Sequence, residues 1–293
     1  MSALRLGTRG SALALAQARW VAERLGDVEL VEVTTAGDLA RDVGDKSRWT
    51  GALERALLAG EIDLAVHSAK DVPGELAPGT AIAAVPERAD PLDVLVGAPS
   101  LTALPAGARV GTSALRRRAQ LLATRPDLDV VELRGNVDTR LRKLAGGEVD
   151  ALVLAAAGLA RLGRTDVVAA PLAGDVFVPA PGQGCLLVQA RDDAPALAAV
   201  DDDAAHLALA TERDVAARLG ASCHTAVGVH AELGFDAVVL RAFVGLPDGA
   251  EWLVDELRDE GDDVDLAALG ATLADRLLAA GAAGLLARAE ATA

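Results

Sequence analysis

The sequence predicts an α/β protein with two related domains in which strands and helices alternate, followed by a small α+β domain. Three observations support this. The chain has 293 residues, and a length well beyond about 150 residues favours more than one domain. Strand-like and helix-like segments alternate through roughly its first two thirds, as in parallel sheets covered by helices. Its composition is 52% hydrophobic, which favours packed cores over disorder.

In the first domain, apolar periodicity and turn residues define the predicted elements. Residues 37–49 are polar, contain glycine and lack periodicity, so a loop is expected there. A turn is expected at 68–73, directly after a buried strand. The predicted strands and helices are strand 4–8, helix 12–25, strand 29–34, helix 51–59 and strand 63–67.

The middle of the chain repeats this plan. A weak internal similarity relates Gly7–Leu13 to Gly111–Leu115, each of which ends a strand and opens a helix. An apolar strand is predicted within 177–189, which suggests that the chain crosses back to the first domain, as in two-lobed binding folds. Between the first domain and this returning strand, the predicted strands are 93–96, 109–111, 129–133 and 150–154.

The last third is predicted to form an α+β domain, with helix 206–219, strands 226–232 and 237–245, and a helix from 265 to the C-terminus. The predicted domain boundaries follow from these elements. They are 1–88 with 184–201 for domain 1, 92–179 for domain 2 and 204–293 for domain 3.

The net charge of −15 is concentrated at one end of the chain. Residues 181–293 carry 7 basic and 20 acidic side chains, whereas residues 91–180 carry 11 basic and 9 acidic ones. This balance argues against a nucleic-acid partner on electrostatic grounds. The acidic runs at 201–203 and 255–265 are interpreted as solvated surface.

The two cysteines are too few for a disulfide framework and lack zinc-ligand spacing, so we expect a reducing compartment and no metal. Cys185 lies in an apolar strand and is predicted to be buried. Cys223 lies in a turn of small residues, where a thiol is accessible for covalent attachment, although most lone cysteines are inert. The first ten residues do not resemble a leader, and no segment offers about 18 uncharged apolar residues. A cytoplasmic protein without membrane association is therefore expected.

Basic residues recur where the predicted strands end. In open α/β sheets, ligands collect at these turns and helix N-termini. Several arginines together favour a ligand with many carboxylates or phosphates, although any one of them is more often a surface or ion-pair residue. The arginines are Arg9, Arg116, Arg117, Arg134, Arg140 and Arg161, and the polar residues near them are Ser11, Ser68, Lys70, Asp71, Thr112, Ser113 and Asn136. Asp71 is a candidate to stabilise a cation or to transfer protons, and capping of a turn is its alternative role.

Six motifs carry a resemblance to a known family. They are LGTRGSALALAQA near the start, DLAVHSAKDVP at 63–73, VGTSALRRRAQL at 110–121, ELRGNVDTRLRKL at 132–144, LAAAGLARLG at 154–163 and PAPGQGC at 179–185. With them, nearly the whole chain resembles the porphobilinogen deaminase (hydroxymethylbilane synthase) family. The resemblance implies two domains like those of periplasmic binding proteins plus a small α+β domain. It also implies an enzyme that joins four porphobilinogen molecules head to tail into hydroxymethylbilane, with loss of ammonia.

The resemblance further implies a dipyrromethane cofactor, attached through a thioether to Cys223 by motif position. In the family pattern, Asp71 contacts pyrrole nitrogens and promotes deamination to an electrophilic azafulvene. The growing chain accumulates acetate and propionate groups, which gives the arginines their ligand. The implied cofactor-binding residues are Cys223, Lys70, Asp71, Thr112, Ser113, Arg116, Arg117, Arg134 and Asn136. The implied substrate-binding residues are Arg9, Ser11, Lys46, Ser68, Arg140, Arg161 and Gln183. A monomer with no metal and no nucleic-acid partner is expected.

Two segments depart from the family pattern. The loop that often contains Lys-Gly-x-Phe is here Lys46-Ser47-Arg48-Trp49, with Ala52 where Glu is common. The Gly-Gly-Cys segment is here Ala221-Ser222-Cys223, and no proline follows closely. Two alternatives remain open: a two-lobed carboxylate-binding protein without catalysis, and a paralogue that has lost turnover. A covalently attached pigment would distinguish the enzyme from the binding protein.

Overall fold

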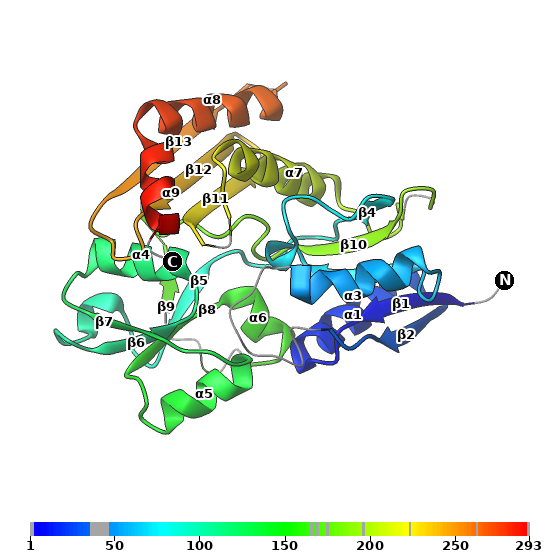
Figure 1. Cartoon of the computed structure of the whole chain (residues 1–293), viewed down its shortest axis with the longest axis horizontal. Coiled ribbons are helices and arrows are strands. Elements are labelled where there is room, and N and C mark those ends of the chain that lie inside the picture. Colours follow the sequence, from blue (N-terminus) through cyan, green and yellow to red (C-terminus); the bar gives the residue numbers. More distant parts are fainter. Residues whose placement is uncertain are drawn as a thin grey trace. The chain divides into compact units, whose positions relative to one another are not determined.

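The computed structural model describes residues 3–35, 47–164, 167, 170–173, 176–194, 197–222, 224–261 and 263–291. The chain divides into two compact units. Unit 1 comprises Met1–Ala89 and Gly182–Leu209, and unit 2 comprises Asp90–Pro181 and Ala210–Ala293. Figure 1 identifies the elements of both units.

Unit 1 contains a mixed sheet in the order β2-β1-β3-β10-β4. β2 and β3 run parallel to β1, whereas β10 is antiparallel to both β3 and β4. The strands are β1 (Leu4–Thr8), β2 (Val28–Glu32), β3 (Leu64–Ser68), β4 (Thr80–Ala84) and β10 (Leu186–Arg191). The helices are α1 (Ala12–Leu25), α3 (Ser47–Leu58) and the short 3-10 helix η1 (Ala69–Asp71).

β3 is buried on both faces, which explains its continuous apolar sequence. Leu64 and Val66 belong to the core that also holds Ala18 and Val21 of α1. Ala65, which points to the other face, packs in the core that contains Leu53, Ala56 and Leu57 of α3. α1 and α3 therefore cover opposite faces of the sheet and leave the strand ends to carry polar groups.

Unit 2 contains a second mixed sheet, in the order β7-β6-β8-β5-β9. β7 and β8 run parallel to β6, and β5 is antiparallel to both β8 and β9. The strands are β5 (Asp93–Val96), β6 (Arg109–Thr112), β7 (Asp129–Glu132), β8 (Ala151–Ala155) and β9 (Ala170–Leu172). The helices are η2 (Leu101–Ala103), α4 (Leu115–Thr124), α5 (Val137–Ala145) and α6 (Ala156–Arg161).

The two sheets share one topology. In each, the central strand (β3 or β8) is parallel to its neighbour on one side (β1 or β6) and antiparallel to its neighbour on the other (β10 or β5). β10 and β5 therefore occupy equivalent positions, and each follows a point where the chain passes from one unit to the other. Gly7 in β1 and Gly111 in β6 also correspond. A Cβ atom on Gly111 would lie 2.9 Å from Leu133 Cδ2 and 3.0 Å from Leu152 Cδ2, and one on Gly7 would collide with Ile62. The predicted fold class, with its repeated plan and returning chain, is confirmed.

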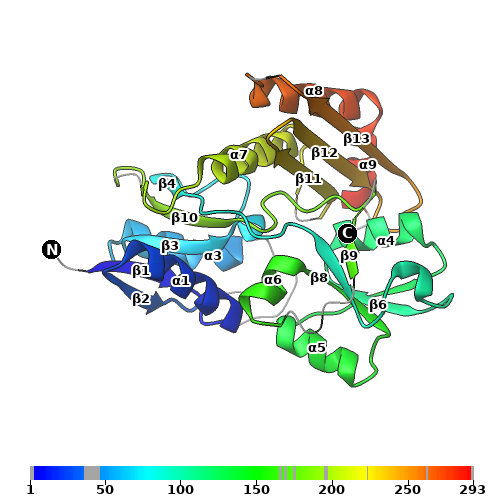
Figure 2. The ribbon, with the colours of Figure 1, turned by 180° about the vertical axis from the view of Figure 1, so that it is seen from behind.

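The C-terminal part of unit 2 adds an antiparallel sheet, β11 (Ala226–Leu233), β12 (Val238–Gly245) and β13 (Trp252–Asp259). Figure 2 shows these strands side by side with α8 (Leu266–Ala279) and α9 (Ala282–Ala291). α7 (Asp203–Arg218) precedes them. Ala226 and Phe243 of this sheet share a core with Ala119 of α4 and with Val178. Within unit 2, the C-terminal sheet therefore packs against the helix that carries Arg116 and Arg117.

Four sequence predictions need correction. α3 begins at Ser47, so its first turn occupies the end of the predicted loop. The returning strand is confined to Leu186–Arg191, because a turn precedes it. The acidic run at 255–265 begins within β13, where Asp255 pairs with Arg276 of α8 on one face of the strand and Glu256 pairs with Arg241 of β12 on the other.

The predicted C-terminal helix is two helices, broken at Gly281 where φ is +105°. Along the described residues, none of the individual helices has the length and hydropathy needed to cross a membrane. Only α8 and α9 taken together meet that test, and they are bent by 70°.

Candidate functional site

In unit 1, the polar residues predicted for the site lie where the parallel strands β1 and β3 end. Arg9 follows β1, and the Ser11 hydroxyl caps α1 by accepting a hydrogen bond from Ala14 N over 3.3 Å. Ser68 ends β3, and Lys70 and Asp71 follow it in η1. Because β1 and β3 are parallel neighbours, their carboxyl ends meet at one edge of the sheet.

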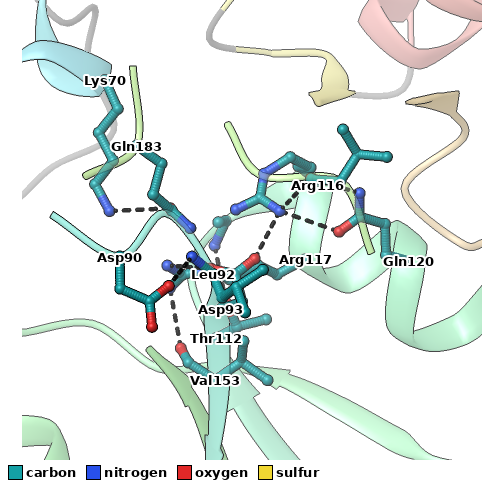
Figure 3. A network of polar contacts seen from close by, with 12 residues as sticks. Lys70, Asp90, Leu92, Asp93, Thr112, Arg116, Arg117, Gln120, Val153 and Gln183 are labelled. Carbon is teal, nitrogen blue, oxygen red and sulfur yellow. Dashed lines mark hydrogen bonds and ion pairs between the residues drawn. The ribbon is translucent and has the colours of Figure 1, made fainter. Parts of the chain in front are cut away.

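Lys70 is held by the turn that precedes β10. Its Nζ donates to Gln183 Oε1 over 3.3 Å, as Figure 3 shows, and the Gln183 side chain is fully buried. The Gln183 backbone carbonyl accepts from Arg88 Nε over 3.0 Å. The structure thus brings Lys70 and Gln183 together, although 113 positions separate them in the sequence. The Asp71 side chain, by contrast, is exposed.

His67 lies in β3 just before these residues and is 6% exposed. Burial lowers its pKa to about 4, the nearby Asp71 carboxylate opposes this shift, and the Arg9 guanidinium adds to it. His67 is therefore neutral at pH 7. These electrostatic effects also place Arg9 and Asp71 in one neighbourhood of unit 1.

In unit 2, the ends of β6 and β7 lead into α4 and α5. The Thr112 hydroxyl accepts from Ala114 N over 3.2 Å, and no side chain caps the start of α4. Asn136 caps α5 by accepting from Thr139 N over 2.9 Å. Arg140 joins the two turns, since its Nη2 donates to Ser113 Oγ over 2.9 Å. Backbone N–H groups in the first turn of α4 therefore face a neighbourhood rich in donors, which suits an anion.

Arg116 and Arg117 are buried and share one carboxylate, that of Asp93 at the start of β5 (Figure 3). Arg116 Nη1 donates to Asp93 Oδ2 over 2.7 Å and to Gln120 Oε1 over 3.0 Å. Arg117 Nε donates to Asp93 Oδ1 over 2.9 Å, and its Nη1 donates to the Val153 carbonyl over 3.0 Å. The exposed fractions are 5% for Arg116, 6% for Arg117 and 2% for Asp93. Two buried cations are thus fixed in orientation by one anion.

Arg116 also links α4 to the segment that precedes the C-terminal sheet. The Val178 carbonyl accepts from Arg116 Nη1 over 2.8 Å and from Gln120 Nε2 over 2.9 Å. The next carbonyl, that of Pro179, accepts from Val229 N of β11 over 2.9 Å. β11 begins at Ala226, shortly after position 223 in the sequence.

The remaining predicted arginines differ in environment. Arg134 is exposed, and its Nε donates to Glu132 Oε1 over 2.7 Å. Arg161 is half-buried and ends α6, which directly follows β8. β6 and β7 run parallel, so Arg134 and Thr112 lie at the same end of their sheet, whereas Arg161 lies at the far end of α6.

Of the two cysteines, the structure describes Cys185 alone, so the prediction for that residue can be tested. Cys185 is fully buried in a core with Ala69, Val72 and Leu187, which confirms its predicted packing. Cys223 lies outside the described residues, as does Lys46. Their predicted roles stay predictions.

Among the residues that sequence reasoning missed and that contact predicted site residues, two are notable for their partners. Asp93 pairs with both buried arginines, and Trp49 lies against Arg9, with the guanidinium carbon 4.0 Å from the ring centroid. Asp93 had a sequence signal, because it is an acidic residue that opens the apolar strand Asp93–Val96. An acid in a fully buried strand generally needs a cationic partner.

Comparisons with known proteins address the whole chain. Residues 4–199 match the family described as "Porphobilinogen deaminase, dipyromethane cofactor binding domain", and residues 206–279 match "Porphobilinogen deaminase, C-terminal domain". Proteins named porphobilinogen deaminase from Roseiflexus sp. (strain RS-1) and Rubrobacter xylanophilus are each 48% identical to it. The alignments cover 97% of this chain and 98% and 96% of those proteins.

Among solved structures, the methionine binding protein MetQ matches with a TM-score of 0.40 and 18% identity, over 65% of this chain and 83% of that one. A periplasmic substrate-binding protein from Coxiella burnetii matches with a TM-score of 0.39 and 15% identity, over 65% and 85%. The family assignment rests on the sequence matches alone. By those matches, which together span nearly all of its length, the chain belongs to the porphobilinogen deaminase family.

Proposed function

We propose that this protein is a hydroxymethylbilane synthase, a transferase that joins four porphobilinogen molecules head to tail with loss of ammonia. The observation that carries this function is membership of the porphobilinogen deaminase family over both the cofactor-binding and the C-terminal region. The arrangement of charged side chains in each unit suits the substrate. Porphobilinogen carries an acetate and a propionate, so each addition brings carboxylates that arginine binds well.

The residues present fit a dipyrromethane cofactor. Its carboxylates need fixed donors, and the first turn of α4 supplies an uncapped helix N-terminus with Arg116 and Arg117 on it. When bound, a dipyrromethane supplies the free α-carbon from which the pyrrole chain grows. We assign binding of its carboxylates to Lys70 in unit 1 and to Thr112, Ser113, Arg116, Arg117, Arg134 and Asn136 in unit 2, and the covalent thioether to Cys223. The Asp93 carboxylate keeps both buried guanidiniums oriented at no cost of reorganisation during binding.

Asp71 is the proposed catalytic residue. Its exposed carboxylate lies at the end of β3, next to Lys70, where it can accept a hydrogen bond from a pyrrole N–H and stabilise developing positive charge. We assign binding of the incoming and elongating substrate to Arg9, Ser11, Lys46, Ser68, Arg140, Arg161 and Gln183. The proposal includes the domain boundaries predicted from the sequence, a monomeric state, a cytoplasmic location and no partner besides porphobilinogen.

Mass spectrometry of the purified protein tests this function. The intact mass should exceed that of the polypeptide by one dipyrromethane, and peptide mapping should place the adduct on the peptide that contains Cys223. The matched control is Cys185, which is fully buried and should remain unmodified. Incubation with porphobilinogen should release ammonia and hydroxymethylbilane. An unmodified Cys223 in active, freshly prepared protein would refute the assigned attachment, and absence of turnover by protein that carries the adduct would refute the activity.

A further inference from the structure

Arg9 is one of two arginines that the structure describes as stacked on a tryptophan. Its guanidinium carbon lies 4.0 Å from the centroid of the Trp49 ring, within unit 1. The other pair is the exposed Arg24 on Trp20, at 3.5 Å, where the half-buried Trp20 ring packs against the core beneath α1. The two pairs differ in place: Arg24 is in the last turn of a helix, whereas Arg9 follows β1 at the sheet edge that holds Asp71.

Trp49 is anchored by the helix that carries it. It is the third residue of α3, and the buried residues Leu53, Ala56 and Leu57 follow it at intervals of four, seven and eight positions. Residues with this spacing lie on one helical face. The half-buried Trp49 ring therefore continues the apolar stripe by which α3 packs on the sheet.

Stacking on an aromatic ring leaves the N–H donors of an arginine available to bind a carboxylate. An aromatic ring attracts a guanidinium through its face, whereas all five N–H donors lie in the guanidinium plane and pair with carboxylates edge-on. A ring over the face thus fixes the plane of the fork without competing for its donors. Fixing that plane before binding reduces the loss of side-chain freedom when a carboxylate is bound.

We propose that Trp49 is a positioning residue that orients the Arg9 guanidinium for the carboxylates of incoming porphobilinogen. This inference rests on the proposed function, because it takes Arg9 as a substrate-binding residue. The electrostatic effect of both Arg9 and Asp71 on His67 supports it, since it places the stacked arginine in the neighbourhood of the proposed catalytic carboxylate.

Steady-state kinetics of Trp49→Leu test this role. The variant should raise KM for porphobilinogen by about 2- to 12-fold, which corresponds to the cost of ordering one rotamer-rich side chain on binding, and should change kcat less than KM. Trp49→Phe should restore most of the difference, because it keeps an aromatic face. Trp20→Leu is the matched control: it removes the Arg24 stack, and KM should stay within about twofold of the wild type. Each variant should carry the wild-type amount of cofactor by intact mass.

A double variant separates positioning from a general packing role. If Trp49 acts through Arg9, adding Trp49→Leu to Arg9→Leu should leave KM unchanged relative to Arg9→Leu alone, because the coupled partner is already absent. Two results would overturn the inference and leave the proposed function intact. One is a KM of the double variant that equals the product of the two single fold-increases, and the other is a wild-type KM for Trp49→Leu in an active enzyme. Wild-type protein that carries cofactor but does not turn over porphobilinogen would overturn both.

Discussion

Asp93 Oδ2 and Arg116 Nη1 are 2.7 Å apart, and both side chains are less than 10% exposed. The carboxylate comes from β5, the first strand after the chain enters unit 2, and the guanidinium comes from the first turn of α4. A second cation, Arg117, pairs with the other oxygen of the same carboxylate. One acidic residue therefore fixes the two arginines that we assign to cofactor binding.

Asp93→Ala should destabilise the protein strongly, because it leaves two guanidiniums buried without their shared carboxylate. Breaking a buried ion pair by removing one partner costs about 3–5 kcal/mol. Asp129→Ala is the control, since it removes an exposed pair with Arg109 at 3.7 Å and should cost about 1 kcal/mol at most. Urea unfolding measures both free energies. Equal losses for the two variants would contradict the buried pair.

His67 should make the stability of the protein depend on pH below neutrality. Its pKa is lowered from 6.5 to about 4 in the folded state, so the unfolded chain binds a proton between these values that the folded chain excludes. Stability is therefore complete above pH 6.5 and falls as the pH drops towards 4, by roughly 3 kcal/mol in total.

His67→Gln should remove this dependence. The slope of unfolding free energy against pH between 4 and 6.5 should decrease by up to one proton relative to the wild type. His224→Gln makes the same change at an exposed histidine and is the matched control for the substitution itself. A wild-type slope in His67→Gln would show that His67 is not the group responsible.

Asp71→Asn should retain the fold and the attached cofactor but lose turnover. The Asp71 side chain is exposed, so the neutral amide should cost little stability. It cannot stabilise developing positive charge, and loss of such a preorganised group commonly costs about 100-fold or more in kcat. Rates of ammonia release, with intact mass as the measure of cofactor content, decide this. Near-normal product formation would remove Asp71 from the catalytic role.

The sequence sufficed for features that local patterns determine. The strand at 93–96 was predicted at its observed bounds, and the shared plan of the two sheets followed from alternating elements and from the similarity around Gly7 and Gly111. The burial of Cys185 followed from its apolar strand. In each case the apolar spacing along one segment carries the information.

Long-range pairings could not be predicted in this way. The contact between Lys70 and Gln183 depends on the chain returning to unit 1, and the Asp93 pairs depend on how α4 packs against β5. β13 was missed because both of its faces mix apolar and charged side chains, so its acidic residues resemble a solvated run. The break at Gly281 lacked a proline or a polar cluster to mark it.

Replacement of Arg116 and of Arg9 should separate cofactor binding from substrate binding. Arg116→Leu removes a donor on the first turn of α4 and should yield protein deficient in dipyrromethane, with a lower Tm because Asp93 loses a buried partner. Arg9→Leu should retain the cofactor and slow chain growth through weaker substrate binding, because its place at the end of β1 is assigned to substrate carboxylates. Intact masses before and after incubation with porphobilinogen show which pyrrole-loaded species accumulates.

A structural arginine distinguishes loss of cofactor from loss of stability. Arg125 pairs with Asp127 over 2.6 Å at the C-terminal end of α4, away from the first turn that is proposed to bind carboxylates. Arg125→Leu should therefore lower Tm and leave the cofactor content unchanged. Because the hydrogen bonds to charged groups lost in Arg116→Leu are worth about 1.5–3 kcal/mol each, that variant should combine lower stability with missing cofactor. Normal cofactor assembly in Arg116→Leu together with its failure in Arg9→Leu would reverse the assignment of the two arginines.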